Sequence, residues 1–260
     1  MTRFQSFRSR LLAREPLIGA WVKTPSPIIA DVLGLTGLDC VCLDAEHAPF
    51  DRIAIDACLS SLRANDMPAL VRPPASAPEH ILNALDCGAA GIVAPHIRNR
   101  DDADAFARAC RYGAGGRGYA GSSRAASYTL RPMSEHLPRS NAETAVIAQI
   151  EDVEALGDID AIASVDGVDC LFVGRIDLTV ALGAATPSDT VVLDAVEAIC
   201  AAGKRRQRPV GMFVGDLNEI PQWRKAGASF FILKSDHSFI FEGARSLRAD
   251  FDRLSASGAE

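Results

Sequence analysis

Apolar stretches of strand length alternate with longer segments of helical periodicity about eight times along the chain. The short stretches are rich in Val, Ile, Leu or Phe without strict alternation, as is typical of parallel strands covered on both faces. We predict strands over residues 17–22, 39–43, 69–72, 91–95, 145–150, 170–173, 210–214 and 230–233. Helices are predicted over residues 27–35, 53–64, 79–87, 102–111, 154–164, 191–202, 219–226 and 239–254.

Glycine follows several of these helical segments just before the next strand, at Gly37, Gly88, Gly167 and Gly227. Glycine readily adopts the left-handed conformation that ends many helices. Regular strand–helix alternation predicts a parallel sheet, and eight units in 260 residues favour a closed barrel over an open doubly wound sheet. The predicted fold is therefore α/β, a (β/α)8 TIM barrel forming a single domain over residues 1–260. A short amphipathic lead-in helix is expected before the first strand.

Charge and cysteine content narrow the classes of partner and compartment. The formal net charge is −6 with both signs scattered, which argues against nucleic acid or an anionic membrane as a partner. No apolar run approaches the roughly 18 residues of a membrane-spanning helix, and the basic N-terminal segment lacks the features of a secretory signal. The seven cysteines lie within apolar segments and indicate core residues in a reducing, cytoplasmic compartment. A zinc site at Cys40 and Cys42 is disfavoured because no second ligand pair is spaced to complete it.

One long irregular stretch covers residues 113–141. Loops of this length inside compact domains are often lids or binding loops, so it is expected to influence substrate length. Its glycine-rich start, residues 113–118, could hold an anion through backbone N–H groups, but it lacks the pattern of a phosphate-binding loop.

Reactive side chains follow several predicted strands at the end where barrel enzymes place their active sites. Glu151 and Asp177 follow adjacent strands and can share one divalent cation, with oxygen ligands that suit Mg²⁺ or Mn²⁺. An α-keto acid would chelate such an ion. Arg72 could then neutralise an enolate oxygen, and His47 could act as the base or orient one.

Each of these residues also has a structural interpretation. Asp177 alone would more often be a helix N-cap, Arg72 alone an ion-pair anchor, and His47 alone a structural histidine. The catalytic interpretation depends on all four residues falling at the same end of four strands. His96, His136 and His237 are not included, and a Schiff base at Lys234 is disfavoured because that lysine has no evident partner.

At these positions the sequence resembles the HpcH/HpaI aldolases, which are metal-dependent pyruvate aldolases that cleave 4-hydroxy-2-oxo acids. The resemblance runs from about residue 17 to residue 251. Its motifs are Asp44-x-Glu46-His47-Ala48-Pro49, Val71-Arg72, Gly116-Arg117-Gly118, Gln149-Ile150-Glu151, Asp166-Gly167-Val168-Asp169 and Phe172-x-Gly174-x-x-Asp177-Leu178.

The resemblance implies a site in which Glu151 and Asp177 bind Mg²⁺ or Mn²⁺, with Co²⁺ also suited. Arg72 would contact the pyruvate oxygen, and His47 would be the base, acting through a metal-bound water with Asp44 in support. The backbone amides of Ile176 and Asp177 would hold the pyruvate carboxylate, and we also assign Gln149 and Trp21 to substrate binding.

The resemblance further implies a homo-trimer or homo-hexamer. Asp86 would reach the histidine of a neighbouring subunit, and the last helix, 239–254, would be exchanged between subunits. Two departures from the family pattern are Arg175, which adds a cation next to the second metal ligand, and His96, where many relatives carry a hydrophobic residue.

The predicted function is aldol cleavage or formation of 4-hydroxy-2-oxo acids, giving pyruvate and an aldehyde. Oxaloacetate decarboxylation would use the same enolate. An acyl-CoA lyase of the citrate lyase β type would need a basic groove, for which Arg98, Arg100 and residues 113–124 are the candidates. A barrel without catalytic activity that binds a metabolite is the third alternative.

Overall fold

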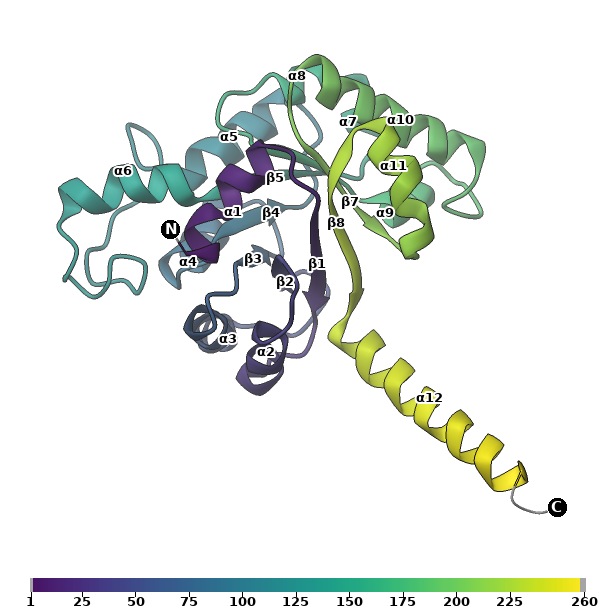
Figure 1. Cartoon of the computed structure of the whole chain (residues 1–260). Helices are drawn as coiled ribbons and strands as arrows, with labels where there is room; N and C mark the ends of the chain where they lie inside the picture. Colours follow the sequence, from purple (N-terminus) through teal and green to yellow (C-terminus); the bar gives the residue numbers. More distant parts are fainter. Residues whose placement is uncertain (1, 258–260) are drawn as a thin grey trace.

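The computed structural model describes residues 2–257, so residues 1 and 258–260 of the predicted domain lie outside the described residues. Eight parallel strands close into a barrel in sequence order, with β8 paired to β1 (Figure 1). The strands are β1 (Leu17–Val22), β2 (Cys40–Asp44), β3 (Ala69–Arg72), β4 (Gly91–Ala94), β5 (Ala145–Ile150), β6 (Cys170–Val173), β7 (Val210–Val214) and β8 (Ala228–Ser235). The predicted TIM barrel is confirmed.

Helices surround the strands and connect each to the next (Figure 1). They are α1 (Arg3–Leu12), α2 (Pro27–Gly34), α3 (Arg52–Ala64), α4 (Pro78–Asp86), α5 (Arg100–Cys110), α6 (Met133–Glu143), α7 (Val153–Gly157), α8 (Ile159–Ala163), α9 (Arg175–Ala181), α10 (Thr190–Arg205), the 3-10 helix η1 (Leu217–Glu219), α11 (Ile220–Ala226) and α12 (Asp236–Ser257). None of these helices is long and apolar enough to span a membrane.

The barrel has two apolar layers because successive strand residues point to opposite faces. On β2, Cys40 and Cys42 face the interior, whereas Val41 and Leu43 pack beneath the surrounding helices. Burial raises the pKa of both thiols, so they stay protonated and act as small apolar residues. All seven cysteines are buried and free, which confirms the prediction of core cysteines.

Helix α1 packs at the N-terminal end of the barrel and confirms the predicted lead-in helix. Phe7 and Leu11 are fully buried there, and Phe7 makes an edge-on ring contact with Phe230 at 6.0 Å. Arg8 fixes the helix to the barrel through an ion pair with the buried Asp169, 2.7 Å away.

Three local predictions were incomplete or wrong. The predicted helix 154–164 is two short helices, α7 and α8, separated at Gly157 and Asp158. Gly37 is not left-handed, because α2 already ends at Gly34, whereas Gly88, Gly167 and Gly227 have φ of 95°, 95° and 115°. Helices α6 and α9 were not predicted; α6 contains Pro138 and is mostly polar.

The prediction of a lid near the active site over residues 113–141 is wrong for the single chain. The segment follows α5, and each helix returns the chain to the N-terminal end of the barrel, opposite the expected site. Its last residues, from Met133 onward, belong to α6, which packs beside α1 at that end (Figure 1).

Helix α12 extends away from the barrel as a long projection (Figure 1). Its start is held firmly: the buried carboxylate of Asp236 accepts hydrogen bonds from the backbone N–H groups of Lys23 and Thr24, at 2.8 and 3.0 Å. The rest of the helix is exposed, including Ile240, Leu247 and Phe251.

Candidate active site

A cavity of about 350 Å³ lies at the C-terminal ends of the strands. Arg72 closes β3, while Gln149 and Phe172 come from β5 and β6. Six of the predicted catalytic or substrate-binding residues line the cavity: Trp21, His47, Arg72, Gln149, Ile176 and Asp177. The structure therefore brings together residues that are up to 156 positions apart in the sequence.

Arg72 is held in one orientation by two carboxylates and an aromatic ring. Its Nε donates a hydrogen bond to one oxygen of Asp44 at 3.0 Å, its Nη2 forms an ion pair with the other oxygen at 2.9 Å, and its Nε lies 3.2 Å from Glu46. The guanidinium group also lies 4.3 Å from the ring centre of Trp21. The hydrogen bond, the ion pairs and the ring contact together restrict the guanidinium, so Arg72 is pre-oriented at the cavity wall.

Asp44 is completely buried at the end of β2. Burial by itself would raise its pKa, but the hydrogen bond and charge of Arg72 outweigh burial and lower it, with help from Lys23, whose Nζ is 3.2 Å away. Asp44 is therefore an ionised anchor. It supports His47 through the backbone, since the N–H of His47 donates to Asp44 at 3.2 Å.

The His47 ring is half exposed, and its Nε2 lies 3.7 Å from Glu46. No hydrogen bond or ion pair joins this ring to any other residue in the described part of the chain. The ring is thus accessible from the cavity, as a group that exchanges protons with a substrate must be.

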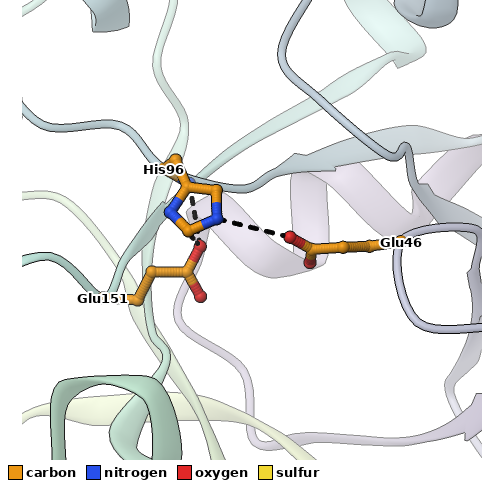
Figure 2. A group of neighbouring side chains, drawn as sticks. All are labelled: Glu46, His96 and Glu151. Atoms are coloured by element: carbon orange, nitrogen blue, oxygen red, sulfur yellow. Dashed lines mark hydrogen bonds and ion pairs between the residues drawn. The ribbon is translucent and has the colours of Figure 1, made fainter. Parts of the chain in front are cut away.

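Glu46, His96 and Glu151 form a compact group next to the cavity (Figure 2). His96 lies between the two carboxylates, with Nε2 3.5 Å from Glu46 and Nδ1 3.4 Å from Glu151. One ligand atom from each residue falls within 4.8 Å of the other two. Adjacent ligands of an octahedral ion with bonds near ~2.1 Å are roughly 3 Å apart, and opposite ones about 4.2 Å apart, so small adjustments would let these three atoms hold a cation.

The backbone at His96 is left-handed, with φ of 56°. Such a conformation is costly for a residue other than glycine and is often found at functional sites. Here it lets the backbone N–H of His96 donate to Glu151 at 2.8 Å, while the ring Nδ1 lies 3.0 Å from Asp152. Burial lowers the pKa of His96, but the Asp152 hydrogen bond and the nearby carboxylates outweigh burial and raise it.

The carboxylates of Glu46 and Glu151 lie close enough to repel one another. Burial raises the pKa of Glu46, and the negative charge of Glu151 raises it further against the opposing effect of Arg72. One buried oxygen of Glu46 accepts no hydrogen bond. Crowded, partly unsatisfied carboxylates with an imidazole between them are a donor set that fits a divalent ion.

Glu151 is nearly completely buried and is fixed by its neighbours. The side-chain amide of Gln149 donates to its second oxygen. Gly174 makes this arrangement possible, because a Cβ at that position would lie 2.7 Å from the Cβ of Glu151 and 2.8 Å from its Oε2. The glycine that precedes α9 is therefore required for close approach of the Glu151 carboxylate.

Asp177 lies in the first turn of α9 and lines the cavity. The alternative interpretation as an N-cap is wrong, because Gly174 occupies that position and Asp177 is three residues further on. No hydrogen bond or ion pair joins Asp177 to Glu151 or to another described residue. The structure thus places both predicted metal ligands at the C-terminal end of the barrel, but the compact group contains Glu151 with Glu46 and His96.

Asp86 is far from this site along the fold. It ends α4, which returns the chain to the N-terminal end of the barrel, and it pairs there with Arg117. Within one chain Asp86 does not join His47, and its catalytic role stays a prediction that depends on a second subunit.

Two other cations line the cavity but have partners. Lys234 pairs with Glu242 of α12, and Arg175 pairs with Glu219 and packs 5.9 Å from the ring centre of Trp223. Arg175 is thus turned toward the helices outside the barrel, not toward Glu151. Lys234 has a partner that its sequence position did not reveal.

The arginines proposed for a CoA-binding groove do not come together. Arg98 lies at the C-terminal end of the barrel, 3.4 Å from Asp152, and Arg100 begins α5. Residues 113–124 lie at the opposite end. The acyl-CoA alternative therefore loses the basic groove on which it depended.

Known proteins are similar to this chain in sequence and in fold. A family model described as HpcH/HpaI aldolase/citrate lyase matches residues 17–241. A hydroxypyruvate/pyruvate aldolase of Paraburkholderia phytofirmans is 33% identical over 92% of this chain and 94% of its own length. A 5-keto-4-deoxy-D-glucarate aldolase of Shigella boydii is 31% identical over 94% and 95%.

Among solved structures, a family protein from Burkholderia cenocepacia J2315 superimposes with a TM-score of 0.90 at 34% identity. The match covers 95% of this chain and 99% of that one.

Proposed function

The chain belongs to the HpcH/HpaI aldolase/citrate lyase family and is an aldolase-type lyase, and we propose that it cleaves or forms 4-hydroxy-2-oxo acids through the enolate of pyruvate. One observation carries the proposal: the pre-oriented Arg72 and the accessible His47 line one cavity, and the group of Glu46, His96 and Glu151 lies directly behind its wall, in contact with Arg72 and Gln149. The proposal is tested by metal-dependent exchange of pyruvate methyl protons with solvent.

We propose that Glu151 and Asp177, with Glu46 and His96 beside them, hold a divalent ion, Mg²⁺ or Mn²⁺, with Co²⁺ also suited. The fit is supported by the close approach of one ligand atom each from Glu46, His96 and Glu151 and by the repulsion between the carboxylates of Glu46 and Glu151. When bound, such an ion would act as a Lewis acid on the keto oxygen of the substrate.

The side chains of the protein would perform the remaining steps. Arg72 would donate hydrogen bonds to the 2-keto oxygen as negative charge develops there. His47 would remove the proton from the 4-hydroxyl group as the C3–C4 bond breaks, releasing the aldehyde and leaving the bonding electrons in the pyruvate enolate. A proton then returns to C3 to give pyruvate. The backbone N–H groups of Ile176 and Asp177, in the first turn of α9, would hold the substrate carboxylate, and Gln149 and Trp21, which line the same cavity, would contact the substrate beside them.

The imidazole of His96 should shift metal preference. The substitution His96→Phe is expected to weaken Mn²⁺ and Co²⁺ binding by about 10- to 100-fold while changing Mg²⁺ affinity less, because nitrogen ligands favour transition metals and Mg²⁺ prefers oxygen. Isothermal titration with each metal measures this difference. Pulsed EPR of Mn²⁺ adds a direct readout, since coupling to the imidazole nitrogen should disappear in the variant.

The control is His80→Phe on α4, which removes an imidazole away from the group and should leave all three affinities unchanged. A nitrogen coupling that persists in the His96 variant, or equal loss of affinity for every metal, would show that His96 is not a ligand.

We propose that the enzyme is a homo-trimer or homo-hexamer that exchanges α12 between subunits. Apolar residues recur along one stripe of α12 at helical spacing, Ile240, Ala244, Leu247, Phe251 and Leu254, and the four larger side chains are exposed. On α2, beside the base of α12, Ile28, Val32 and Leu35 form a second exposed stripe with the same spacing. Two such stripes would be mutually buried if α12 of a second copy packed against the barrel.

A charged residue within the apolar stripe of α12 should dissociate the assembly. The substitution Leu247→Glu is expected to lower the mass measured by light scattering toward that of one chain, because a buried charge opposes helix packing. Ser246→Glu adds the same charge next to the stripe and should leave the mass unchanged. A wild-type protein that is already monomeric at micromolar concentration would contradict the exchange.

The same assembly gives Asp86 its proposed role. Residues 1–260 would form one aldolase domain per subunit, with Asp86 of one subunit reaching His47 of another.

The buried, free cysteines support a cytoplasmic, reducing environment.

A further inference from the structure

A second cavity, of about 210 Å³, lies at the N-terminal end of the barrel. Its walls come from the start of α1, the end of α3, the turn before β4 and the segment from Arg117 to Thr144. None of these elements contributes to the cavity at the other end of the barrel. The volume is below the roughly 300–1,000 Å³ of common organic-ligand pockets, which favours a small ligand.

Arginine dominates the charge of this cavity. Arg63, Arg117, Arg131 and Arg139 line it, against the two carboxylates Asp66 and Glu143. Two more carboxylates pair with these arginines from outside the wall: Asp86 pairs with Arg117, and Glu135 lies 3.6 Å from Arg131. The wall itself carries more guanidinium groups than carboxylates, which favours a small anion as its ligand.

The carboxylates nearby do not neutralise all four guanidinium groups. Glu143 pairs with Arg139 at 2.9 Å, and Asp66 is occupied by the backbone N–H groups of Arg3 and Phe4. Arg63 has no carboxylate partner among residues 2–257; its guanidinium lies 5.8 Å from the ring centre of Phe4.

Repulsion from neighbouring arginines destabilises the charged form of Arg63. Partial burial lowers the pKa of Arg63, and the positive charges of Arg131, Arg124 and Arg139 lower it further. Like charges crowded in this way are destabilising unless an anion lies between them.

Hydrogen-bond donors at this cavity also lack acceptors. Arg117 is nearly completely buried beside Asp86, yet its Nε has no hydrogen-bond partner. His136 is buried too: its Nε2 lies 3.2 Å from the hydroxyl of Tyr112, and its Nδ1 has no partner. Burial and the charges of Arg117 and Arg131 lower the pKa of His136, so the ring is neutral and can carry its proton on Nδ1.

We propose that this cavity binds a small oxyanion of the phosphate or dicarboxylate class, with Arg63, Arg131 and Arg139 as the charged contacts. Guanidinium groups bind both kinds of oxyanion through paired N–H donors. Within one chain this cavity lies at the opposite end of the barrel from the aldolase site, and the binding proposed for it does not depend on the function proposed there.

Calorimetric titration of the full-length, EDTA-treated enzyme tests the proposal, with inorganic phosphate and malonate as separate probes at low ionic strength. One saturable site per chain is expected. Arg63→Gln should weaken it by on the order of tenfold or more, because it removes a charged contact without leaving a carboxylate unpaired. Arg206→Gln, on the exposed end of α10, is the matched control and should leave the affinity unchanged.

Circular dichroism of each variant establishes that it is folded. Tighter binding of phosphate than malonate would assign the site to phosphates, and the reverse order to dicarboxylates. Absence of saturable binding by either anion, or equal affinity in wild type and Arg63→Gln, would overturn the proposal.

Discussion

The substitution Glu151→Gln is expected to abolish lyase activity and to weaken divalent-ion binding by more than about 100-fold. It keeps the size of the side chain but removes the charge that a metal ligand needs. It also disturbs the local hydrogen bonds, because both Glu151 oxygens accept, one from the backbone of His96 and one from the amide of Gln149. An amide nitrogen cannot accept either bond. Metal titration and a coupled assay of pyruvate release measure the two losses.

Glu154→Gln is the matched control, since Glu154 is exposed on the next helix, α7. It should behave as wild type. If Glu151→Gln kept wild-type metal affinity, Glu151 would not be a ligand. If affinity fell but cleavage persisted without metal, the chemistry would have to run by another route, and Lys234 would be the first residue to test.

The second large effect is expected at Arg72. Arg72→Lys should lower kcat by about 10²- to 10³-fold with little change in KM, because the lost donors act on charge that develops only in the transition state. Lysine keeps the positive charge beside Asp44 but cannot contact both Asp44 oxygens with two nitrogens, as Arg72 does at 3.0 and 2.9 Å. Steady-state kinetics with metal in excess give both constants.

Arg72→Ala separates catalysis from stability. It removes the main partner of the fully buried Asp44 and leaves Lys23, 3.2 Å away, as the remaining cation, so a loss of about 3 kcal/mol in the free energy of unfolding is expected in addition to the loss of activity. Arg205→Lys, on the exposed surface, is the control for both variants. A change in KM alone for Arg72→Lys would contradict a role in stabilising the enolate.

The strands were predictable because their burial leaves a clear pattern in the sequence. Five of the eight have the predicted bounds, and the others differ at their ends. The positions of Arg72 and Glu151 at the C-terminal end of the barrel followed directly, since each residue lies at the end of a buried strand. The contact between Asp44 and Arg72 was not predicted, because it depends on how β2 and β3 pair.

The role of His96 was harder to predict because it depends on backbone conformation. Its left-handed φ turns the residue so that its backbone N–H meets Glu151 and its ring lies between Glu151 and Glu46. Histidine does not specify this conformation. Glu46 carried a stronger signal, since it lies between Asp44 and His47 in the first motif, but only the fold shows how close it is to Glu151.

Within one chain the lid prediction for residues 113–141 was wrong, for a physical reason that the sequence did contain. The segment follows a helix, and connections from helix to strand lie at the N-terminal end of a barrel. Its length alone suggested a lid, whereas its place in the strand–helix order gave the correct end. Asp86 follows the same rule, which is why it lies away from His47 within one chain.

The most direct test of the central claim is exchange of the pyruvate methyl protons in D₂O, followed by NMR, with EDTA-treated enzyme and after Mg²⁺ or Mn²⁺ is restored. The measurement detects enolate formation without requiring the aldehyde to be known. We expect exchange only when metal is present, and none above background with Glu151→Gln. Exchange that persists in EDTA, or no exchange under any condition, would contradict a metal-dependent pyruvate enolate.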